Sequence, residues 1–178
     1  MKSIMRIVLV GYMGSGKTTF GKILAKKLGV PFLDSDKFIS SQQGMEINEI
    51  FQEKGEAFFR SLEKEFISNL MHSTEDFVLS TGGGLPCFEN NMDLLNQIGT
   101  TIYLEMSPNA LLKRLENGKE NRPLIKELSD NELLVFIDRQ LKERNPYYQQ
   151  AQIKFHGINA KNSEEISKLI DSITLKKP

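Results

Sequence analysis

The feature that most constrains this chain is a glycine-rich turn between a short apolar run and a helical pattern. Residues 5–10 form the apolar run, which is typical of a strand buried on both faces of a parallel sheet. Residues 17–28 carry apolar side chains at helical spacing, and Gly29 is a natural helix stop. These residues therefore predict a contiguous strand, loop and helix.

The turn itself has the pattern of a phosphate-binding loop, because residues 11–18 read GYMGSGKT. Its glycines let backbone N–H groups converge on phosphate oxygens, and the helix N-terminus adds partial positive charge there. Lys17 supplies a full charge to the β- and γ-phosphates, and the Thr18 hydroxyl is a candidate Mg²⁺ ligand. The loop predicts nucleotide binding through the following residues: Gly14, Ser15, Gly16, Lys17, Thr18 and Thr19.

The overall composition excludes several classes of partner. Lys plus Arg (23) equals Asp plus Glu (23), so no global field favours nucleic acid or an acidic membrane surface. No segment reaches the roughly 20 apolar residues of a membrane span. The single Cys87 cannot form an internal disulfide, which suits a reducing compartment. We therefore expect one cytoplasmic domain over residues 1–178 that binds neither nucleic acid nor a membrane.

Further short apolar runs alternate with helical stretches along the chain. The runs cover residues 32–33, 77–79, 101–104 and 152–155, and this alternation predicts an α/β domain with a five-stranded parallel sheet. A largely helical insertion over residues 36–71 is expected to break at Gly44 and Gly55. The polar segment 117–130 predicts a mobile loop, although a plain surface connection would have the same composition.

Two segments that follow predicted strands are candidates for an acceptor site. Asp34 and Asp36 lie at the edge of the sheet where open α/β folds bind ligands. In the functional interpretation Asp34 supports Mg²⁺ through water and Asp36 binds or deprotonates an acceptor hydroxyl; capping of the next helix is the alternative. The glycines Gly82, Gly83 and Gly84 indicate close approach of a ligand to the backbone, with a wide turn as the alternative.

Four arginines complete the set of candidate residues. Arg60 and Arg144 would together form a fork for a planar carboxylate, whereas each alone is typical of a surface ion pair. Arg122 lies in the polar loop and is a candidate for a charge that reaches the phosphoryl group when the loop closes. Arg114 either borders the adenine or faces solvent, and the sequence leaves both open.

These motifs resemble the shikimate kinase family in their order and spacing from about residue 7 to about residue 148. The matching segments are GYMGSGKTT (11–19), DSD (34–36), GEAFFR (55–60), GGG (82–84), RPL (122–124) and RNPYY (144–148). Tyr147 and the pair Leu85-Pro86 depart from residues common in the family, which affects the expected shape of the pocket rather than its charges. Segment 159–162, on the adenine side, is too weakly patterned to assign contacts.

The resemblance implies a three-layer αβα fold of the P-loop kinase type, usually monomeric, with a substrate region at about 36–72 and a lid at about 117–130. It also implies transfer of a phosphoryl group from ATP to the 3-hydroxyl of shikimate, with Mg²⁺ as cofactor. Lys17, Asp36 and Arg122 would be catalytic, with Asp36 as base and Arg122 as the lid arginine. Arg60 and Arg144 would clamp the carboxylate. The alternatives are a kinase for another hydroxy acid such as gluconate, or a nucleotide-binding regulatory module without catalysis.

Overall fold

The structure is a computed structural model that describes residues 5–119, 122, 124–156, 167–171 and 173. Five parallel strands form one sheet in the order β2-β3-β1-β4-β5. The strands are β1 (Arg6–Val10), β2 (Phe32–Asp34), β3 (Phe77–Ser80), β4 (Thr100–Glu105) and β5 (Ile153–His156). The predicted parallel sheet is confirmed, and each predicted strand lies within one residue of its observed ends.

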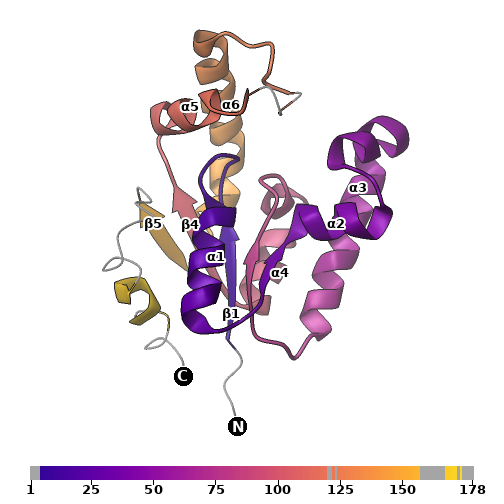
Figure 1. Cartoon of the computed structure of the whole chain (residues 1–178), viewed down its shortest axis with the longest axis vertical. Helices are drawn as coiled ribbons and strands as arrows, with labels where there is room; N and C mark the ends of the chain where they lie inside the picture. The colour runs from indigo at the N-terminus through magenta and orange to yellow at the C-terminus, as the bar shows by residue number, and fades with distance from the viewer. Residues whose placement is uncertain (1–4, 120–121, 123, 157–166, 172, 174–178) are drawn as a thin grey trace.

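Helices cover both faces of this sheet (Figure 1). They are α1 (Lys17–Leu28), α2 (Ser35–Gln43), α3 (Ile47–His72), the short 3₁₀ helix η1 (Leu85–Cys87), α4 (Asn91–Ile98), α5 (Pro108–Glu116) and α6 (Asp130–Tyr148). Residues 167–171 are also helical. In Figure 1 the α2–α3 segment and the α5–α6 pair stand on either side of the glycine loop that leads into α1.

Alternation along β1 divides the core into two layers, because successive side chains of a strand point to opposite faces. Ile7 and Leu9 pack with α1 and with Leu169 near the C-terminus, whereas Val8 and Val10 pack on the side of α3, α4 and α6. Both sets are fully buried. The expected three-layer αβα arrangement is therefore observed.

The helical insertion breaks at both of the predicted glycines, Gly44 and Gly55. Gly44 ends α2 in the left-handed conformation, with φ 64° and ψ 23°. At Gly55 the backbone leaves the helical conformation, with φ 81° and ψ 170°. Two helical stretches therefore meet at a kink at Gly55, and together they are labelled α3. The kink alters the direction of the helix just before Arg60.

The described part of the polar segment 117–130 consists mainly of turns before α6 begins at Asp130. Ile125 is fully buried in the core on the side of α6, so the second half of this segment is anchored. Residues 120, 121, 123 and the adenine-side segment 159–162 lie outside the described residues. Among the described helices, none is long and apolar enough to cross a membrane.

The two glycines of the insertion allow a test of how much the kink depends on backbone conformation. A methyl group would meet no atom within 4 Å at Gly44 or at Gly55, so any effect of substitution by alanine is conformational. The left-handed helical region costs an alanine about 1 kcal/mol, whereas the region of Gly55 is nearly specific to glycine and should cost about 2–3 kcal/mol. We expect Gly55→Ala to destabilise the protein more than Gly44→Ala in urea unfolding, and equal effects would contradict this explanation.

Candidate functional site

The glycine loop joins β1 to α1 and encloses the amine of Lys17. Lys17 is buried, and its Nζ donates hydrogen bonds to the carbonyl oxygens of Gly11 (2.7 Å) and Tyr12 (2.9 Å). Burial lowers the pKa of Lys17 to about 8, against a partial opposite effect of the Asp36 and Asp34 carboxylates. Burial thus removes hydration from the Lys17 ammonium group. The negative charge of an arriving phosphate would compensate for that loss.

A cavity of about 560 Å³ opens in front of this loop. Most of the residues that were predicted to bind the nucleotide line this cavity. Residues of the two candidate acceptor segments line it as well. Its lining comprises Met13, Gly14, Gly16, Lys17, Thr18, Thr19, Asp34, Asp36, Ser80, Thr81, Gly82, Gly83, Arg114 and Arg122. Ser15 is buried behind the lining instead, and its hydroxyl has no hydrogen-bond partner within the described part of the chain.

Three oxygen-bearing side chains meet beside the loop at the ends of β2 and β3. The Thr18 hydroxyl donates to Asp34 Oδ2 at 3.0 Å and lies 3.4 Å from the Ser80 hydroxyl. Asp34 also caps α2, since its Oδ1 accepts from the Lys37 N–H at 3.3 Å. The helix-cap interpretation and the proximity to Thr18 are thus both observed for Asp34, one for each carboxylate oxygen.

Asp36 points from the first turn of α2 toward the backbone at Gly82. A methyl group added to Gly82 would come within 2.5 Å of Asp36 Oδ1, which shows how closely the two segments approach. The Ser35 hydroxyl reinforces this contact, because it accepts a hydrogen bond from the Gly82 N–H at 2.8 Å. Burial and the nearby Asp34 carboxylate raise the pKa of Asp36, while the Lys17 ammonium partly offsets them.

The other two glycines of the triplet each face one of the predicted arginines. A methyl carbon at Gly83 would lie 3.5 Å from Arg144 Nη1, and one at Gly84 would lie 3.2 Å from both Nη atoms of Arg60. The triplet therefore contacts a carboxylate and two guanidinium groups in sequence. These side chains come from α2, α3 and α6, and α6 is far from the other two helices in the sequence. Close approach accounts for Gly82 and, less strictly, for Gly84, whereas a side chain at Gly83 would make only ordinary contacts.

Arg60 is held by two carboxylates of its own helix. Its Nη1 donates to Glu63 at 2.6 Å, and its Nη2 donates to Glu56 at 3.0 Å. The guanidinium also lies 5.3 Å from the Phe88 ring centre. Burial raises the pKa of the Glu63 carboxyl, with the Arg60 guanidinium acting against that rise. Arg60 therefore forms the predicted ion pair. Its partner Glu63 is buried, however, and the guanidinium lies beside Gly84.

Arg144 approaches the triplet from α6 and lies over an aromatic ring of the glycine loop. Its guanidinium carbon is 5.6 Å from the centre of the Tyr12 ring. Tyr148, one turn later on α6, donates from its hydroxyl to the Gly83 carbonyl at 2.6 Å. Two residues of one helical turn therefore approach the same glycine, Arg144 where a Cβ atom would project and Tyr148 at the carbonyl oxygen.

The remaining two arginines contact backbone near the nucleotide loop. Arg114 donates from Nη1 to the Ser15 carbonyl at 3.1 Å and lines the cavity, so it faces the loop rather than open solvent. Arg122 lines the same cavity and donates to the Gly118 carbonyl at 3.1 Å. The geometry thus places both side chains at the nucleotide end of the site.

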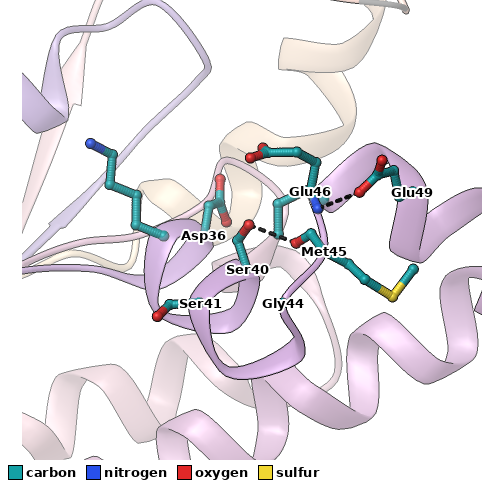
Figure 2. Close-up of a pocket in the computed structure, with 9 residues that line it drawn as sticks. Asp36, Ser40, Ser41, Gly44, Met45, Glu46 and Glu49 are labelled. Atoms are coloured by element: carbon teal, nitrogen blue, oxygen red, sulfur yellow. Dashed lines mark hydrogen bonds between the residues drawn. The ribbon is translucent and has the colours of Figure 1, made fainter.

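A second cavity of about 550 Å³ lies on the other side of Asp36. Figure 2 shows α2 residues Asp36, Ser40 and Ser41 on one side of it and Met45, Glu46 and Glu49 on the other. The Ser40 hydroxyl donates to the Met45 carbonyl at 2.6 Å, and the Glu46 N–H donates to Glu49 at 2.8 Å. Asp36 is therefore shared by two hollows, one facing the glycine loop and one facing the turn between α2 and α3.

Sequence reasoning missed several residues that the structure places at the site. Glu63 was detectable, since a carboxylate three residues after Arg60 on a helix is a common partner. Ser35 and Ser80 flank assigned motifs, but a hydroxyl in either position has no local signal that predicts its partner. Tyr12 and Tyr148 reach the site only because the glycine loop and α6 meet.

Comparisons with known proteins were made for the whole chain. Residues 13–174 match the family described as shikimate kinase. A shikimate kinase of Bacteroides fragilis is 47% identical over 151 residues, which is 83% of this chain and 82% of that protein. The 1.7 Å crystal structure of shikimate kinase from Bacteroides thetaiotaomicron has a TM-score of 0.87 and 40% identity, covering 97% of this chain and 98% of that one.

A further similar solved structure is that of a ligand complex. It is the shikimate kinase from Acinetobacter baumannii in complex with shikimate, with a TM-score of 0.84 and 33% identity. The match covers 99% of this chain and 96% of that one.

The close approach of Gly82 to Asp36 predicts a specific coupling between the two positions. Gly82→Ala should lower stability by about 1–3 kcal/mol, because the added methyl group overlaps the carboxylate. The corresponding fall in melting temperature is about 2–4 °C per kcal/mol for a chain of this size. In an Asp36→Ala background the same substitution should have little effect, because the obstructing oxygen is gone.

Gly83→Ala serves as the matched control in the same thermal-unfolding experiment. Its methyl group would meet neighbours no closer than 3.4 Å, which is ordinary contact. A Gly82→Ala effect that is the same with and without Asp36 would contradict the proposed contact.

Proposed function

The chain belongs to the shikimate kinase family, and from that premise we propose how its site transfers the γ-phosphoryl group of ATP to the 3-hydroxyl of shikimate. The products are shikimate 3-phosphate and ADP, a step toward chorismate and the aromatic amino acids. The observation that carries the proposal is the glycine triplet. Its three residues contact Asp36, Arg144 and Arg60 in turn beside the phosphate loop, which supplies one acceptor for a proton and two cations for a carboxylate.

The nucleotide binds in the cavity in front of the glycine loop. Backbone N–H groups of the loop and the Lys17 ammonium bind the β- and γ-phosphates, with the N-terminus of α1 adding partial positive charge. This role is supported by the burial of Lys17 and by its present hydrogen bonds to two loop carbonyls. Arg114 and Arg122 line the same cavity and add positive charge at its other edge.

The oxygen ligands beside the loop fit Mg²⁺ that arrives with ATP. The Thr18 hydroxyl would bind the ion directly and Asp34 through water, a set typical of Mg²⁺ shared with substrate phosphates. Among the described residues there is no cluster of three or more His, Cys, Asp or Glu side chains that would hold a metal by itself. When bound, the ion supplies charge that offsets the phosphate oxygens.

Asp36 is the proposed base for the acceptor hydroxyl. Its carboxylate lies at the boundary between the nucleotide cavity and the hollow beside α2. A raised pKa makes this carboxylate a stronger proton acceptor than an exposed aspartate, while Lys17 and Arg60 stabilise its charged form. Asp36 is thus able to take the proton of a hydroxyl that attacks a phosphoryl group held by the loop.

Arg60 and Arg144 are proposed to bind the shikimate carboxylate. They reach neighbouring glycines of one short segment, so an acceptor lying on that segment is within reach of both. Glu63 and Glu56 hold the Arg60 guanidinium in place before any substrate binds. Such an arrangement reduces the ordering that binding requires.

Arg122 is proposed as the arginine that stabilises charge on the transferring phosphoryl group. It belongs to the segment 117–130, proposed as a lid, and already faces the nucleotide cavity. The buried Ile125 would act as the fixed end about which the first part of the segment closes. The monomeric state and the cytoplasmic location remain predictions from the sequence.

The test of this function is ADP release by the purified protein with Mg-ATP and a series of acceptors. Shikimate, quinate, gluconate and nucleoside monophosphates should be compared at equal concentrations. Strong stimulation by shikimate alone is expected. Stimulation by another acceptor would overturn the choice of shikimate, and no stimulation by any of them would favour a regulatory role without catalysis.

Replacement of Asp36 separates its chemical role from its effect on stability. Asp36→Asn should reduce kcat by about 10²–10⁴-fold, the usual contribution of a general base, while the affinity for ATP changes little. Initial rates and nucleotide binding measured on the same variant test this prediction. Near-normal turnover would remove the base assignment.

The same variant should be more stable than the wild type at neutral pH. The pKa of Asp36 is raised in the folded state, so folding favours its protonated form and loses stability as pH rises through that pKa. Asparagine has no such dependence. The variant should therefore melt higher at about pH 7, and the difference should shrink toward about pH 4.

The proposed carboxylate clamp predicts an effect confined to the acceptor. Arg60→Ala should raise the KM for shikimate by about 10²-fold, because a charge-assisted hydrogen bond contributes about 1.5–3 kcal/mol. Arg60→Lys should recover only part of this, since it keeps the charge but not the two-pronged geometry.

Lys64→Ala is the matched control for Arg60. Lys64 lies one turn further along α3 and pairs with Glu89 at 3.2 Å, with most of its side chain exposed. Its removal should leave the KM for shikimate unchanged. If both variants behave alike, Arg60 has no specific part in acceptor binding.

A further inference from the structure

We propose that Tyr12 is a positioning residue for the acceptor half of the site, and that it acts by holding the Arg144 guanidinium on the face of its ring. The inference rests on the proposed function, in which Arg144 binds the carboxylate of the acceptor. It assigns a role to a residue of the phosphate loop that the loop motif itself leaves variable.

The position of Tyr12 is rigid. Its side chain is only 1% exposed and packs in the core formed with Val10, Tyr103 and Tyr148. A ring enclosed on this scale has few alternative rotamers, because neighbouring side chains occupy the space into which it would turn. A group in contact with the ring is therefore held about as rigidly as the backbone of the loop.

The Arg144 guanidinium rests on this ring, with its central carbon 5.6 Å from the ring centre. That separation is within the range in which the ring's negative face attracts a cation. The contact holds Arg144 beside Gly83, where Nη1 would be 3.5 Å from an added methyl carbon. The Tyr148 side chain also hydrogen-bonds to Arg144. Without the Tyr12 ring, the arginine would keep that bond but would have more rotamers open to it, and its approach to the acceptor would be less well defined.

The ring, and not the hydroxyl, carries this role. The Tyr12 hydroxyl is buried and has no hydrogen-bond partner within the described residues. Burial raises its pKa to about 12, with the Arg144 charge acting in the opposite direction, so the phenol stays neutral and forms no ion pair with Arg144. The attraction of Arg144 to Tyr12 is consequently that of a cation for an aromatic face.

The backbone of Tyr12 touches the other half of the site. Its carbonyl oxygen accepts a hydrogen bond from Lys17 Nζ at 2.9 Å, while its ring supports Arg144. One residue thus contacts both the lysine proposed to bind phosphate and the arginine proposed to bind the acceptor carboxylate. The rigid Tyr12 residue therefore helps to set the distance between the phosphate-binding lysine and the carboxylate-binding arginine.

The central experiment is steady-state kinetics of Tyr12→Leu, which removes the aromatic face and keeps an apolar side chain. The KM for shikimate should rise about tenfold, equivalent to about 1.4 kcal/mol. The KM for ATP should change by no more than about threefold, since leucine keeps the carbonyl that contacts Lys17. An unchanged KM for shikimate in a folded Tyr12→Leu protein would overturn the proposal.

Two further variants separate positioning from general damage to the core. Tyr12→Phe keeps the ring and should restore the KM for shikimate to within about twofold of the wild type. Phe77→Leu is the matched control, because Phe77 is also 1% exposed, belongs to the same core and lies 5.7 Å beneath the Arg6 guanidinium. It is at the amino end of β3, so it should reduce stability without altering the KM for shikimate.

A double-mutant cycle with Arg144→Ala tests whether Tyr12 acts through Arg144. Adding Tyr12→Leu to Arg144→Ala should raise the KM for shikimate by less than about twofold, because the group to be positioned is already absent. Full additivity would overturn the proposal. If Tyr12→Leu does not fold, Tyr12→Met, with its unbranched side chain, takes its place in the cycle.

A spectroscopic readout makes the inference independent of catalysis. Resonances of the Arg144 side chain should be shifted by the ring of Tyr12 in the wild type and in Tyr12→Phe, and should lose that shift in Tyr12→Leu. Absence of the shift in the folded wild type would overturn the positioning itself. A wild type that shows the shift but does not phosphorylate shikimate would instead overturn the proposed function.

Discussion

Parallel pairing of β1 with both β3 and β4 brings the ends of the central strands to one level of the sheet. Leu9 pairs with Ser80, and Asp34 of β2 pairs with the same Ser80, so the glycine loop, the aspartates and the glycine triplet leave the sheet side by side. A shift of one residue in this register would turn every following side chain to the other face. Each later feature of the site depends on this common edge.

Charged groups gather at that edge at some cost to the fold. Lys17 is buried with a lowered pKa, whereas Asp36 and Glu63 have raised pKa values because each has lost solvent. Attraction of Asp36 to Lys17 and of Glu63 to Arg60 offsets only part of that cost, as is usual for buried ionic groups. Perturbed pKa values gathered in one cleft are typical of catalytic sites, and here Lys17 and Asp36 line the same cavity.

The two halves of the site are joined by backbone and aromatic contacts rather than by a flexible connection. The triplet of glycines allows Asp36, Arg144 and Arg60 to approach one short segment, and the Tyr148 hydroxyl binds the carbonyl of its middle residue. Rigid support of this kind reduces the entropy lost when substrates are ordered for transfer. Substitutions at supporting positions are therefore expected to act on geometry without touching a substrate.

The sequence by itself determined the elements and the loop. The strands, the helix that follows the loop and the breaks at Gly44 and Gly55 depend on side-chain periodicity and on the conformations open to glycine, which are properties of near neighbours. Only the tertiary structure decided the pairing of Arg60 with buried Glu63 and the placement of Arg144 on Tyr12. A single arginine in the sequence is equally compatible with a surface ion pair and with a binding site. The choice depends on where segments separated by many residues meet, and that is decided by packing of the whole core.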